Sequence, residues 1–215
     1  MIDRIIWDWN GTLLDDVAVC VECMNELLSE YGLAAIETEY YKRVFCFPVR
    51  EYYAKLGFDF EKVPFEKTGL EFIEKYDKKQ SGAVLVRHAA KVLGKFARAG
   101  LEQIVLSASE VNALKAQIQP FGVAGYFRDI LGIDNRLAAG KLSIAREYFE
   151  RRGISAESSV LIGDTEHDAD VAAALGARCI LVANGHQCKE VLAAAGVPVA
   201  ADIDEAAEMV LKEVL

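Results

Sequence analysis

The sequence predicts an α/β fold, in which a doubly wound parallel sheet is interrupted after its first strand by an all-helical insert. From residue 83 to the end of the 215-residue chain, short apolar runs alternate with helical periodicity, as in parallel sheets covered on both faces. Between residues 15 and 82, aromatic and charged residues recur at helical spacing without strand alternation. We therefore expect a sheet domain at residues 1–14 and 83–215 and a helical domain at residues 15–82.

The first strand is the apolar run at residues 2–7, which ends at Asp8 before the turn-forming pair Asn10 and Gly11. A helix is expected over residues 17–31, because apolar side chains recur there at spacings of three and four and Gly32 supplies a C-cap. The rest of the insert, from about residue 38 to residue 80, is expected to hold two or three more helices.

Beyond Ser81 and Gly82 the two periodicities alternate, and glycines 100, 153 and 176 end three of the expected helices. Helices are predicted over residues 86–99, 110–119, 143–152, 167–175, 189–195 and 204–214. The short apolar runs between them predict strands at residues 103–106, 159–162, 179–182 and 198–200, and a short strand or a turn at residues 129–133.

Charge and composition exclude several classes of protein. A net charge of −9 disfavours nucleic acid and anionic membranes as partners, and 53 % apolar residues exclude a disordered chain. No apolar run reaches the length of a membrane span, and the first residues lack the pattern of a secretory signal. The five irregularly spaced cysteines favour reduced thiols, so a cytoplasmic protein is expected. Cys20 and Cys23 lie within a helical pattern and are interpreted as small core residues, not as a redox motif.

Polar residues follow the predicted strands at their carboxyl ends. Asp8 follows the first strand, Ser107 the strand at residues 103–106, and Asp164 and Asp168 the strand at residues 159–162. In a parallel sheet these ends share one edge, so three carboxylates are expected to converge there. Carboxylates held close together raise one another's pKa unless a cation lies among them, and Mg²⁺ suits such oxygen ligands. The plainer alternative is helix capping, with Asp164 or Thr165 at the start of the helix at residues 167–175.

Taken in this order, the residues resemble the motifs of the haloacid dehalogenase-like hydrolase superfamily over the whole chain. The run Asp8-Trp9-Asn10-Gly11-Thr12 stands at the family's first motif, Asp-x-Asp-x-Thr, and Gly163-Asp164-Thr165-x-x-Asp168 stands at its fourth. Ser107 and Lys141 stand at the second and third motifs. The resemblance implies a Rossmann-like core with an inserted helical cap of the C1 type, similar to phosphoglycolate phosphatases.

The resemblance also implies a role for each matched residue. Asp8 would be the nucleophile that forms an aspartyl-phosphate, and Lys141 would balance the charge of Asp8 and the phosphate. Mg²⁺ would be held by Asp8, the main-chain carbonyl of Asn10 and Asp164, with Asp168 close by. The expected phosphate site comprises the backbone N–H groups of Trp9 and Ala108, the Ser107 hydroxyl, Lys141, and Thr12, which would brace the loop.

Asn10 departs from the family pattern. In the family's hydrolases this position holds a second Asp that protonates the leaving group and activates water, whereas an amide cannot carry a proton near neutral pH. Such acid–base catalysis is typically worth about 10²- to 10⁴-fold in rate. The favoured interpretation is a phosphatase acting on a small phosphorylated metabolite, in which Asn10→Asp would increase activity. Its acid–base step is either slowed by Asn10 or rerouted through water, Glu166, His167 or a cap residue.

Two alternatives to this phosphatase stay open. One is a phosphate-binding or regulatory protein that keeps the pocket without turnover. The other is a hydrolase of carbon–halogen or carbon–phosphorus bonds, whose members also lack the second Asp. The carbon–phosphorus type needs a cap lysine that forms an imine with the substrate, and the candidates in the insert are Lys42, Lys55, Lys62 and Lys67.

Several other residues are candidates for the site. Arg50 follows an aromatic-rich segment and could grip a substrate carboxylate, although a surface salt bridge is the plainer interpretation. His167 could support Asp168, whereas His186 is expected to be exposed to solvent. The connections near residues 14–16 and 81–82 are expected to be hinges for closure of the cap. Four tyrosines are expected to pack the cap helices: Tyr40, Tyr41, Tyr52 and Tyr53.

Overall fold

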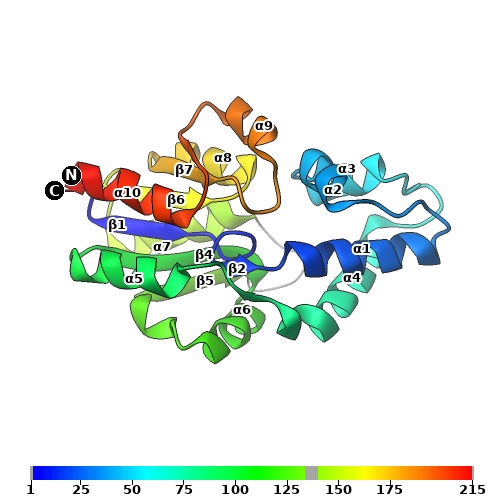
Figure 1. Ribbon diagram of the computed structural model, residues 1–215, viewed down its shortest axis with the longest axis horizontal. Coiled ribbons are helices and arrows are strands. Elements are labelled where there is room, and N and C mark those ends of the chain that lie inside the picture. Colours follow the sequence, from blue (N-terminus) through cyan, green and yellow to red (C-terminus); the bar gives the residue numbers. More distant parts are fainter. Residues whose placement is uncertain (1, 134–139, 215) are drawn as a thin grey trace.

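Six parallel strands form the centre of the larger domain in the computed structural model, which describes residues 2–133 and 140–214 (Figure 1). Their order is β5-β4-β1-β6-β7-β8, and each neighbouring pair is parallel. The predicted doubly wound parallel sheet is therefore confirmed. The strands are β1 (Arg4–Trp7), β4 (Glu102–Glu110), β5 (Asp129–Ile133), β6 (Ser159–Gly163), β7 (Arg178–Val182) and β8 (Val199–Ala200).

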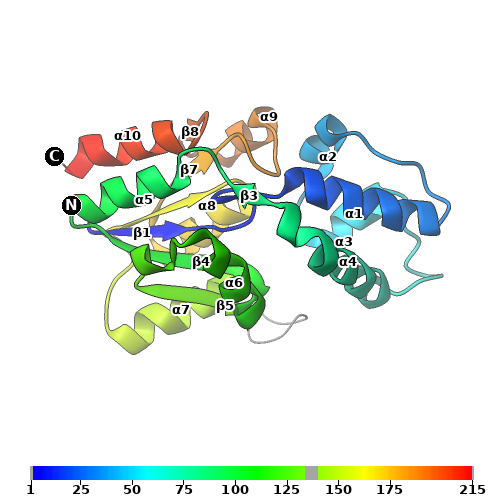
Figure 2. The same ribbon diagram turned by 60° about the horizontal axis from the view of Figure 1, so that its bottom comes forward.

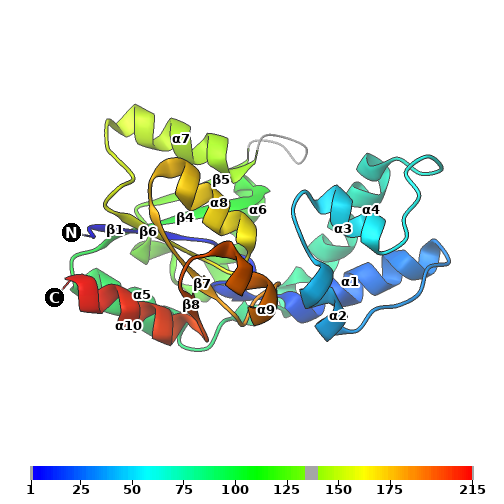
Figure 3. The same cartoon turned by 90° about the horizontal axis from the view of Figure 1, so that it is seen from above.

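Helices cover both faces of this sheet (Figure 3). On β1, Ile5 and Trp7 pack into the core beneath α5, α6 and α10, whereas Ile6 packs into the core beneath α7, α8 and α9. Burial on both faces explains why the strands are apolar throughout instead of alternating. One group of helices is α5 (Ala89–Arg98), α6 (Val111–Ile118) and α10 (Ile203–Val214), and the other is α7 (Lys141–Arg152), α8 (Glu166–Leu175) and α9 (Lys189–Leu192). Short 3₁₀ turns lie at Gln80–Gly82, Gln119–Phe121, Ala124–Tyr126 and Ala193–Ala195.

The insert is all-helical and lies beyond the carboxyl ends of the strands (Figure 2). It holds α1 (Val17–Glu30), α2 (Thr38–Val44), α3 (Val49–Lys55) and α4 (Phe65–Lys79), so three helices follow the first, within the predicted number. This cap has its own apolar core, formed by α1 residues such as Met24 and Leu27 against Tyr52 and Tyr53 of α3. Cys20 and Cys23 are buried on α1, as predicted.

The two connections between the domains pair with each other, which the sequence did not reveal. β2 (Leu14–Asp15) and β3 (Val84–Leu85) form a two-stranded antiparallel sheet at the point where the chain enters and leaves the cap. Because residues 84–85 form this strand, the helix predicted from residue 86 begins only at Ala89. β4 is also longer than predicted and continues through Ser107 to Glu110, with an irregular register after Leu106. No helix in the described ranges is both long and apolar enough for a membrane span.

Candidate active site

The sheet brings three carboxylates together at its carboxyl edge. Asp8 directly follows β1 and Asp164 directly follows β6. These strands are neighbours, with Trp7 opposite Ile162, so the two side chains leave the sheet side by side. Asp168 joins them from the first turn of α8. One oxygen from each of the three buried carboxylates lies within 4.8 Å of the others. The convergence expected from the strand ends is thus present in the structure.

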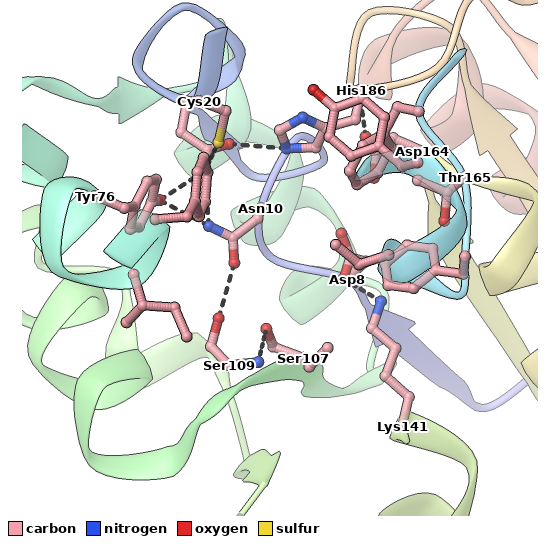
Figure 4. Close-up of a pocket in the computed structure, with 18 of the residues that line it drawn as sticks. Asp8, Asn10, Cys20, Tyr76, Ser107, Ser109, Lys141, Asp164, Thr165 and His186 are labelled. Atoms are coloured by element: carbon pink, nitrogen blue, oxygen red, sulfur yellow. Dashed lines mark hydrogen bonds and ion pairs between the residues drawn. The ribbon is translucent and has the colours of Figure 1, made fainter. Parts of the chain in front are cut away.

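Lys141 supplies a positive charge to this cluster. It is the first residue of α7, not a loop residue before a helix at residue 143 as expected, and its side chain reaches up to the strand edge (Figure 4). Its ammonium group donates hydrogen bonds to Asp8 Oδ1 and, at 2.7 Å, to Asp168 Oδ1. Lys141 is 5 % exposed, so these interactions take place largely out of water.

Asp168 also caps its own helix. Its Oδ2 atom accepts hydrogen bonds from the backbone N–H of Thr165 at 3.1 Å and from the Thr165 hydroxyl at 2.8 Å. Thr165 is the N-cap of α8 and Asp168 is the third residue of the helix, so the pair forms a capping box. The capping role and the role in the carboxylate cluster therefore coexist, with one oxygen of Asp168 given to each.

Charge in the cluster is unbalanced. Burial, together with the neighbouring carboxylates of Asp168 and Asp164, raises the pKa of Asp8 well above its usual range, although Lys141 works in the opposite direction. Burial likewise raises the pKa of Asp164. Burial alone would also raise the pKa of Asp168, but Lys141 and Thr165 hold it below its usual value. Lys141 and, for Asp164, His186 act against these shifts, but of the three carboxylates only Asp168 has its pKa lowered.

This donor set fits a hard divalent cation. Two carboxylates without full compensation provide the charge, and their oxygens are the ligands that Mg²⁺ prefers. The carboxylates are also held in place, since the Thr12 hydroxyl lies 3.2 Å from both Asp8 Oδ2 and Asp164 Oδ1. Glycine is needed beside them, because a Cβ atom added at Gly11 or Gly185 would overlap the side chain of Asp164.

Thr12 braces the loop after β1, as expected, whereas the contact of the Trp9 backbone N–H with phosphate stays a prediction. Neither residue lines the pocket above Asp8. Thr12 is fully buried behind the carboxylates, where its hydroxyl braces Asp8 and Asp164. The indole of Trp9 is buried as well and donates a hydrogen bond to Gln117 Oε1 at 3.1 Å. Ser107 and Ala108 do line the pocket, next to Asp8.

Asn10 faces the cap and is fully engaged. Its amide nitrogen donates hydrogen bonds to Asp16 Oδ2 at 2.8 Å and to the Tyr76 hydroxyl at 2.9 Å. Its amide oxygen accepts one from the Ser109 hydroxyl at 3.1 Å. Tyr76 also donates to Asp16 Oδ2 at 2.6 Å, and Asp16 Oδ1 accepts from the Gly11 backbone N–H at 3.0 Å. Asn10 therefore joins the loop after β1, the domain connection and helix α4.

His186 is part of the site, so the expectation that it is exposed is wrong. It is 6 % exposed and lies between the two domains. Its backbone N–H donates to Asp164 Oδ2 at 2.6 Å, its Nε2 lies 3.3 Å from Asp16 Oδ1, and its Nδ1 lies 2.8 Å from the hydroxyl of Tyr41 in α2. Burial opposes protonation of this ring, but the Asp16 and Asp164 carboxylates prevail and raise the pKa of His186 to about 9.

A pocket of about 300 Å³ lies above Asp8, between the sheet edge and the cap. Tyr41, Tyr52 and Tyr53 pack in the cap core as expected, and they also line this pocket. Tyr40 departs from that expectation, because it is 40 % exposed. Cys20 lines the pocket too, with its thiol 3.7 Å from Asp16 Oδ2.

The basic residues of the cap that were considered as site residues do not line the pocket. The expectation that Arg50 could grip a substrate carboxylate is therefore corrected. The side chain of Arg50 is exposed and stacks over the ring of Phe60 at 4.6 Å, away from the pocket. The four cap lysines considered for an imine also do not line the pocket, as far as the described residues define it. His167 stacks on Phe47 of the cap, with ring centroids 4.6 Å apart. Burial and the charge of Lys141 lower the pKa of this ring, and the Asp168 carboxylate opposes that shift.

Comparisons with known proteins agree with this geometry. A phosphoglycolate phosphatase from Rhodospirillum rubrum is 24 % identical over 197 residues, which cover 86 % of this chain and 81 % of the relative. A haloacid dehalogenase-like family hydrolase from Streptococcus pneumoniae superimposes with a TM-score of 0.84 at 16 % identity, over 100 % of this chain and 99 % of the other. CbbY from Rhodobacter sphaeroides, in complex with phosphate, gives a TM-score of 0.71 at 20 % identity, over 95 % and 96 %.

These structural likenesses support the fold, and the family follows from the sequence itself. Residues 5–182 match the family model of haloacid dehalogenase-like hydrolases. The matched segment runs from β1, which positions Asp8, through the cap to the end of β7, and so includes Lys141, Asp164 and Asp168. Because the match covers most of the chain, the protein belongs to the haloacid dehalogenase-like hydrolase family.

Proposed function

We propose that this protein is a Mg²⁺-dependent phosphatase that acts on a small phosphorylated metabolite through an aspartyl-phosphate on Asp8. The observation that carries the proposal is the position of the Asp8 carboxylate. It lies at the base of the interdomain pocket, bonded to Lys141 and beside Asp164 and Asp168. The kinship with a phosphoglycolate phosphatase supports a phosphorylated substrate.

The reaction would begin with attack of the Asp8 carboxylate on phosphorus. Lys141 orients this carboxylate and offsets the negative charge that it and the phosphoryl group bring together. Ser107 accepts a hydrogen bond from the backbone N–H of Ser109 at 3.1 Å, so its own O–H can donate to a phosphoryl oxygen. The ion would be held by Asp8, Asp164 and the main-chain carbonyl of Asn10, where it would neutralise charge on the transferred group.

Asn10 is the residue expected to limit the rate of this enzyme. Its amide is committed to Asp16, Tyr76 and Ser109, and it has no proton to give to a leaving group or to take from water. We therefore expect the aspartyl-phosphate to be hydrolysed slowly, at a rate about 10²- to 10⁴-fold below that of an enzyme with a carboxyl group at position 10. The same observation favours the second candidate, a protein that captures phosphate at Asp8 without sustained turnover.

Hydrolysis of a carbon–phosphorus bond receives less support. Such a reaction needs an amine that can form an imine beside the substrate. Lys141 is the lysine among the described residues that line the pocket, and its ammonium group is bonded to Asp8 and Asp168. The four cap lysines considered for this role do not line the pocket in the described part of the chain.

The test is release of inorganic phosphate from p-nitrophenyl phosphate with Mg²⁺ by the wild type, by Asp8→Asn and by Asp170→Asn. Asp170 is exposed on α8, two residues after Asp168, and serves as the matched control. The phosphatase requires release that Asp8→Asn abolishes and Asp170→Asn retains. Acid-quenched samples analysed by mass spectrometry should carry one phosphoryl group on Asp8. A phosphorylated Asp8 with no continued release would support the phosphate-capture function, and equal release by Asp8→Asn would refute both.

A further inference from the structure

A second group of metal-ligating side chains lies at the junction of the two domains. Asp16, Cys20 and His186 are all buried, and one possible ligand atom from each lies within 4.8 Å of the others. None of the three belongs to the carboxylate cluster described above. Figure 4 shows Cys20 and His186 close together in the pocket, away from Lys141. The described part of the chain therefore brings two separate groups of potential ligands to this pocket.

The sequence places two of these ligands one helical turn apart. Asp16 is the N-cap of α1 and Cys20 lies four residues later, where its backbone N–H donates to the carbonyl of Asp16 at 2.9 Å. Residues four apart lie on the same face of a helix, and both of these side chains line the pocket. His186 comes from the loop after β7, in the sheet domain. The three ligands therefore span the boundary between the domains.

The distances between the ligand atoms suit a four-coordinate ion. His186 Nε2 lies 3.3 Å from Asp16 Oδ1, and Cys20 Sγ lies 3.7 Å from Asp16 Oδ2. In a tetrahedral zinc site, bonds of about 2.0–2.3 Å place neighbouring ligand atoms about 3.3–3.6 Å apart. The side chains thus need little movement to surround an ion. All three line the interdomain pocket, so water can take the fourth position.

Two of the ligands are already oriented by other groups. His186 Nδ1 lies 2.8 Å from the Tyr41 hydroxyl, and Nε2 faces Asp16. A histidine that binds a metal through one ring nitrogen usually donates the other N–H to a fixed partner, and Tyr41 is placed for this role. Asp16 accepts hydrogen bonds from the Gly11 backbone N–H at 3.0 Å and from the Tyr76 hydroxyl at 2.6 Å. These contacts hold the ring and the carboxylate in position before an ion binds.

The types of ligand atom select the metal. A thiolate, an imidazole and a carboxylate together suit Zn²⁺, whereas Mg²⁺ prefers oxygen ligands alone. The cluster around Asp8 offers carboxylate oxygens only, within the described residues. Binding of Zn²⁺ replaces the thiol proton of Cys20 and any proton on His186 Nε2, and these protons pass to the solvent. The two groups of ligands are therefore expected to prefer different ions.

We propose that Asp16, Cys20 and His186 form a second metal site, which takes Zn²⁺ with the Cys20 thiolate as a ligand and joins the cap to the sheet domain. This inference goes beyond the proposed phosphatase and does not depend on it, because no ligand is shared with the carboxylate cluster. The alternative is that the same three side chains form hydrogen bonds to one another and have no affinity for metal.

Cobalt substitution tests the site in the wild-type protein. Co²⁺ bound to a thiolate gives a charge-transfer band in the near ultraviolet, and four-coordinate Co²⁺ absorbs strongly in the visible. Six-coordinate Co²⁺ with oxygen ligands does neither. With excess Mg²⁺ present, we expect both absorptions from the wild type, and we expect Zn²⁺ to abolish them by displacing Co²⁺. X-ray absorption of the zinc-loaded protein should show a sulfur ligand at about 2.3 Å.

Variants assign the ligands. Cys20→Ser should remove the charge-transfer band, and both Cys20→Ser and His186→Gln should weaken Zn²⁺ binding by at least about 100-fold, more than the loss of a supporting group does. Cys23→Ser is the control, because Cys23 is buried on the same helix but does not line the pocket. Tyr41→Phe should weaken binding by about 10- to 100-fold. Its control is Tyr40→Phe, since Tyr40 is 40 % exposed.

The outcomes separate this inference from the proposed function. A wild type with neither a charge-transfer band nor a sulfur ligand would overturn the inference, whichever variants fold. Zn²⁺ affinity that survives Cys20→Ser or His186→Gln would overturn it as well, and Cys20→Ala repeats the test if Cys20→Ser does not fold. Asp8→Asn should abolish phosphate release and keep the band. Conversely, a band in a wild type that releases no phosphate would remove the phosphatase and leave the zinc site standing.

Discussion

At the scale of single residues, Asn10 is best understood together with Asp16. The Asn10 amide donates to Asp16 Oδ2 at 2.8 Å, and Asp16 is buried at 1 % exposure. A carboxylate at position 10 would face the carboxylate of Asp16 with no hydrogen to share. The amide is therefore complementary to its neighbour, and we expect the effects of substitutions at Asn10 and Asp16 to be coupled.

This coupling changes the expectation for Asn10→Asp. Alone, it is expected to destabilise the protein by about 1–3 kcal/mol, because a hydrogen bond is replaced by repulsion between buried groups. Its gain in turnover should then be small. The double variant Asn10→Asp/Asp16→Asn restores an amide–carboxylate pair with the partners exchanged, and it should recover stability and hydrolyse faster than either single variant.

Thermal unfolding and phosphate release of the four proteins in this cycle provide the measurement. Asp16 also contacts Gly11, Tyr76 and His186. The single variant Asp16→Asn therefore serves as the control for stability that is lost through these three contacts. Additive effects of the two substitutions on stability would mean that Asn10 and Asp16 are not coupled, and would contradict this account of the Asn10 position.

Gly185 is a second position where one residue controls the site indirectly. A Cβ atom here would overlap the Asp164 side chain, so Gly185→Ala must displace that carboxylate. We expect Mg²⁺ affinity to fall by about 10- to 100-fold, as is typical when the support of a metal ligand is disturbed. Titration of phosphatase activity with Mg²⁺ measures this. Gly125→Ala is the control, since nothing lies within 4 Å of a Cβ atom there; equal Mg²⁺ dependence in both variants would rule out the steric argument.

At the scale of elements, local signals explain which parts of the fold could be predicted. The strands of the parallel sheet are continuous apolar runs, and each is bounded by a turn or a helix signal in the adjacent residues. β8, which also has two residues, was predicted from its place in the alternation of apolar runs and helices, whereas β2 and β3 lie outside that alternation and were not predicted. They form only because the chain returns from the cap beside its point of entry, which is a tertiary event.

The same distinction applies to the site. Asp8, Asp164 and Asp168 follow strands in the sequence, so their convergence could be predicted from topology alone. The burial of His186 depends on Tyr41, which is 145 residues away and belongs to the other domain. The position of His186 after β7 could have indicated that it lies at the edge of the sheet. No residue near it in the sequence indicates that the cap buries its side chain. The position of Arg50 likewise depends on packing with Phe60 within the cap.

The loop after β7 also ties the cap to the sheet. Gln187, 1 % exposed, accepts a hydrogen bond from the backbone N–H of Glu166 at 2.7 Å and donates one to the carbonyl of Phe45 at 2.9 Å. The backbone N–H of Cys188 donates to the carbonyl of Lys42 at 3.1 Å. One side chain thus connects the start of α8, next to Asp168, with the segment between α2 and α3.

Gln187→Ala should loosen the cap without altering the carboxylates. We expect the free energy of unfolding to fall by about 1–3 kcal/mol, because two partly buried backbone groups lose their partner. We also expect a higher KM with a smaller change in kcat, since an open cap binds substrate less well. Hydrogen exchange of the segment around Phe45 should accelerate. The control is Gln119→Ala, in an exposed turn; unchanged exchange near Phe45 would show that this bridge does not hold the cap.

At the scale of the whole molecule, the contacts between the domains lie around the pocket. The β2–β3 pair forms the connection, the Asn10–Asp16–Tyr76 group lies at its inner end, and the loop at residues 184–188 lies on the other side. Opening the cap would break the contacts with Tyr76 and with this loop while the paired strands stay intact. The position of the cap is therefore coupled to the same residues that border the carboxylate cluster.

We expect the carboxylate cluster to make the stability of the whole molecule depend on a divalent cation. Without one, burial disfavours the ionised forms of Asp8 and Asp164, as their raised pKa values indicate. Binding of Mg²⁺ to the folded protein alone should stabilise it by about 2.7 kcal/mol at a concentration 100 times the dissociation constant. For a chain of this length, that corresponds to a rise in Tm of roughly 5–11 °C.

Differential scanning fluorimetry with Mg²⁺ against EDTA, at ionic strength matched with KCl, measures this rise. Asp164→Asn distinguishes the effect of Mg²⁺ binding from the effect of the buried charge. It removes a ligand, so the response to Mg²⁺ should largely disappear, and it also removes a buried charge, so the metal-free protein should be at least as stable as the wild type. Asp170→Asn, which alters an exposed acid on the same helix as Asp168, should respond to Mg²⁺ like the wild type. A wild type whose Tm is unchanged by Mg²⁺, or an Asp164→Asn variant that keeps the full response, would mean that the three carboxylates are not a cation site.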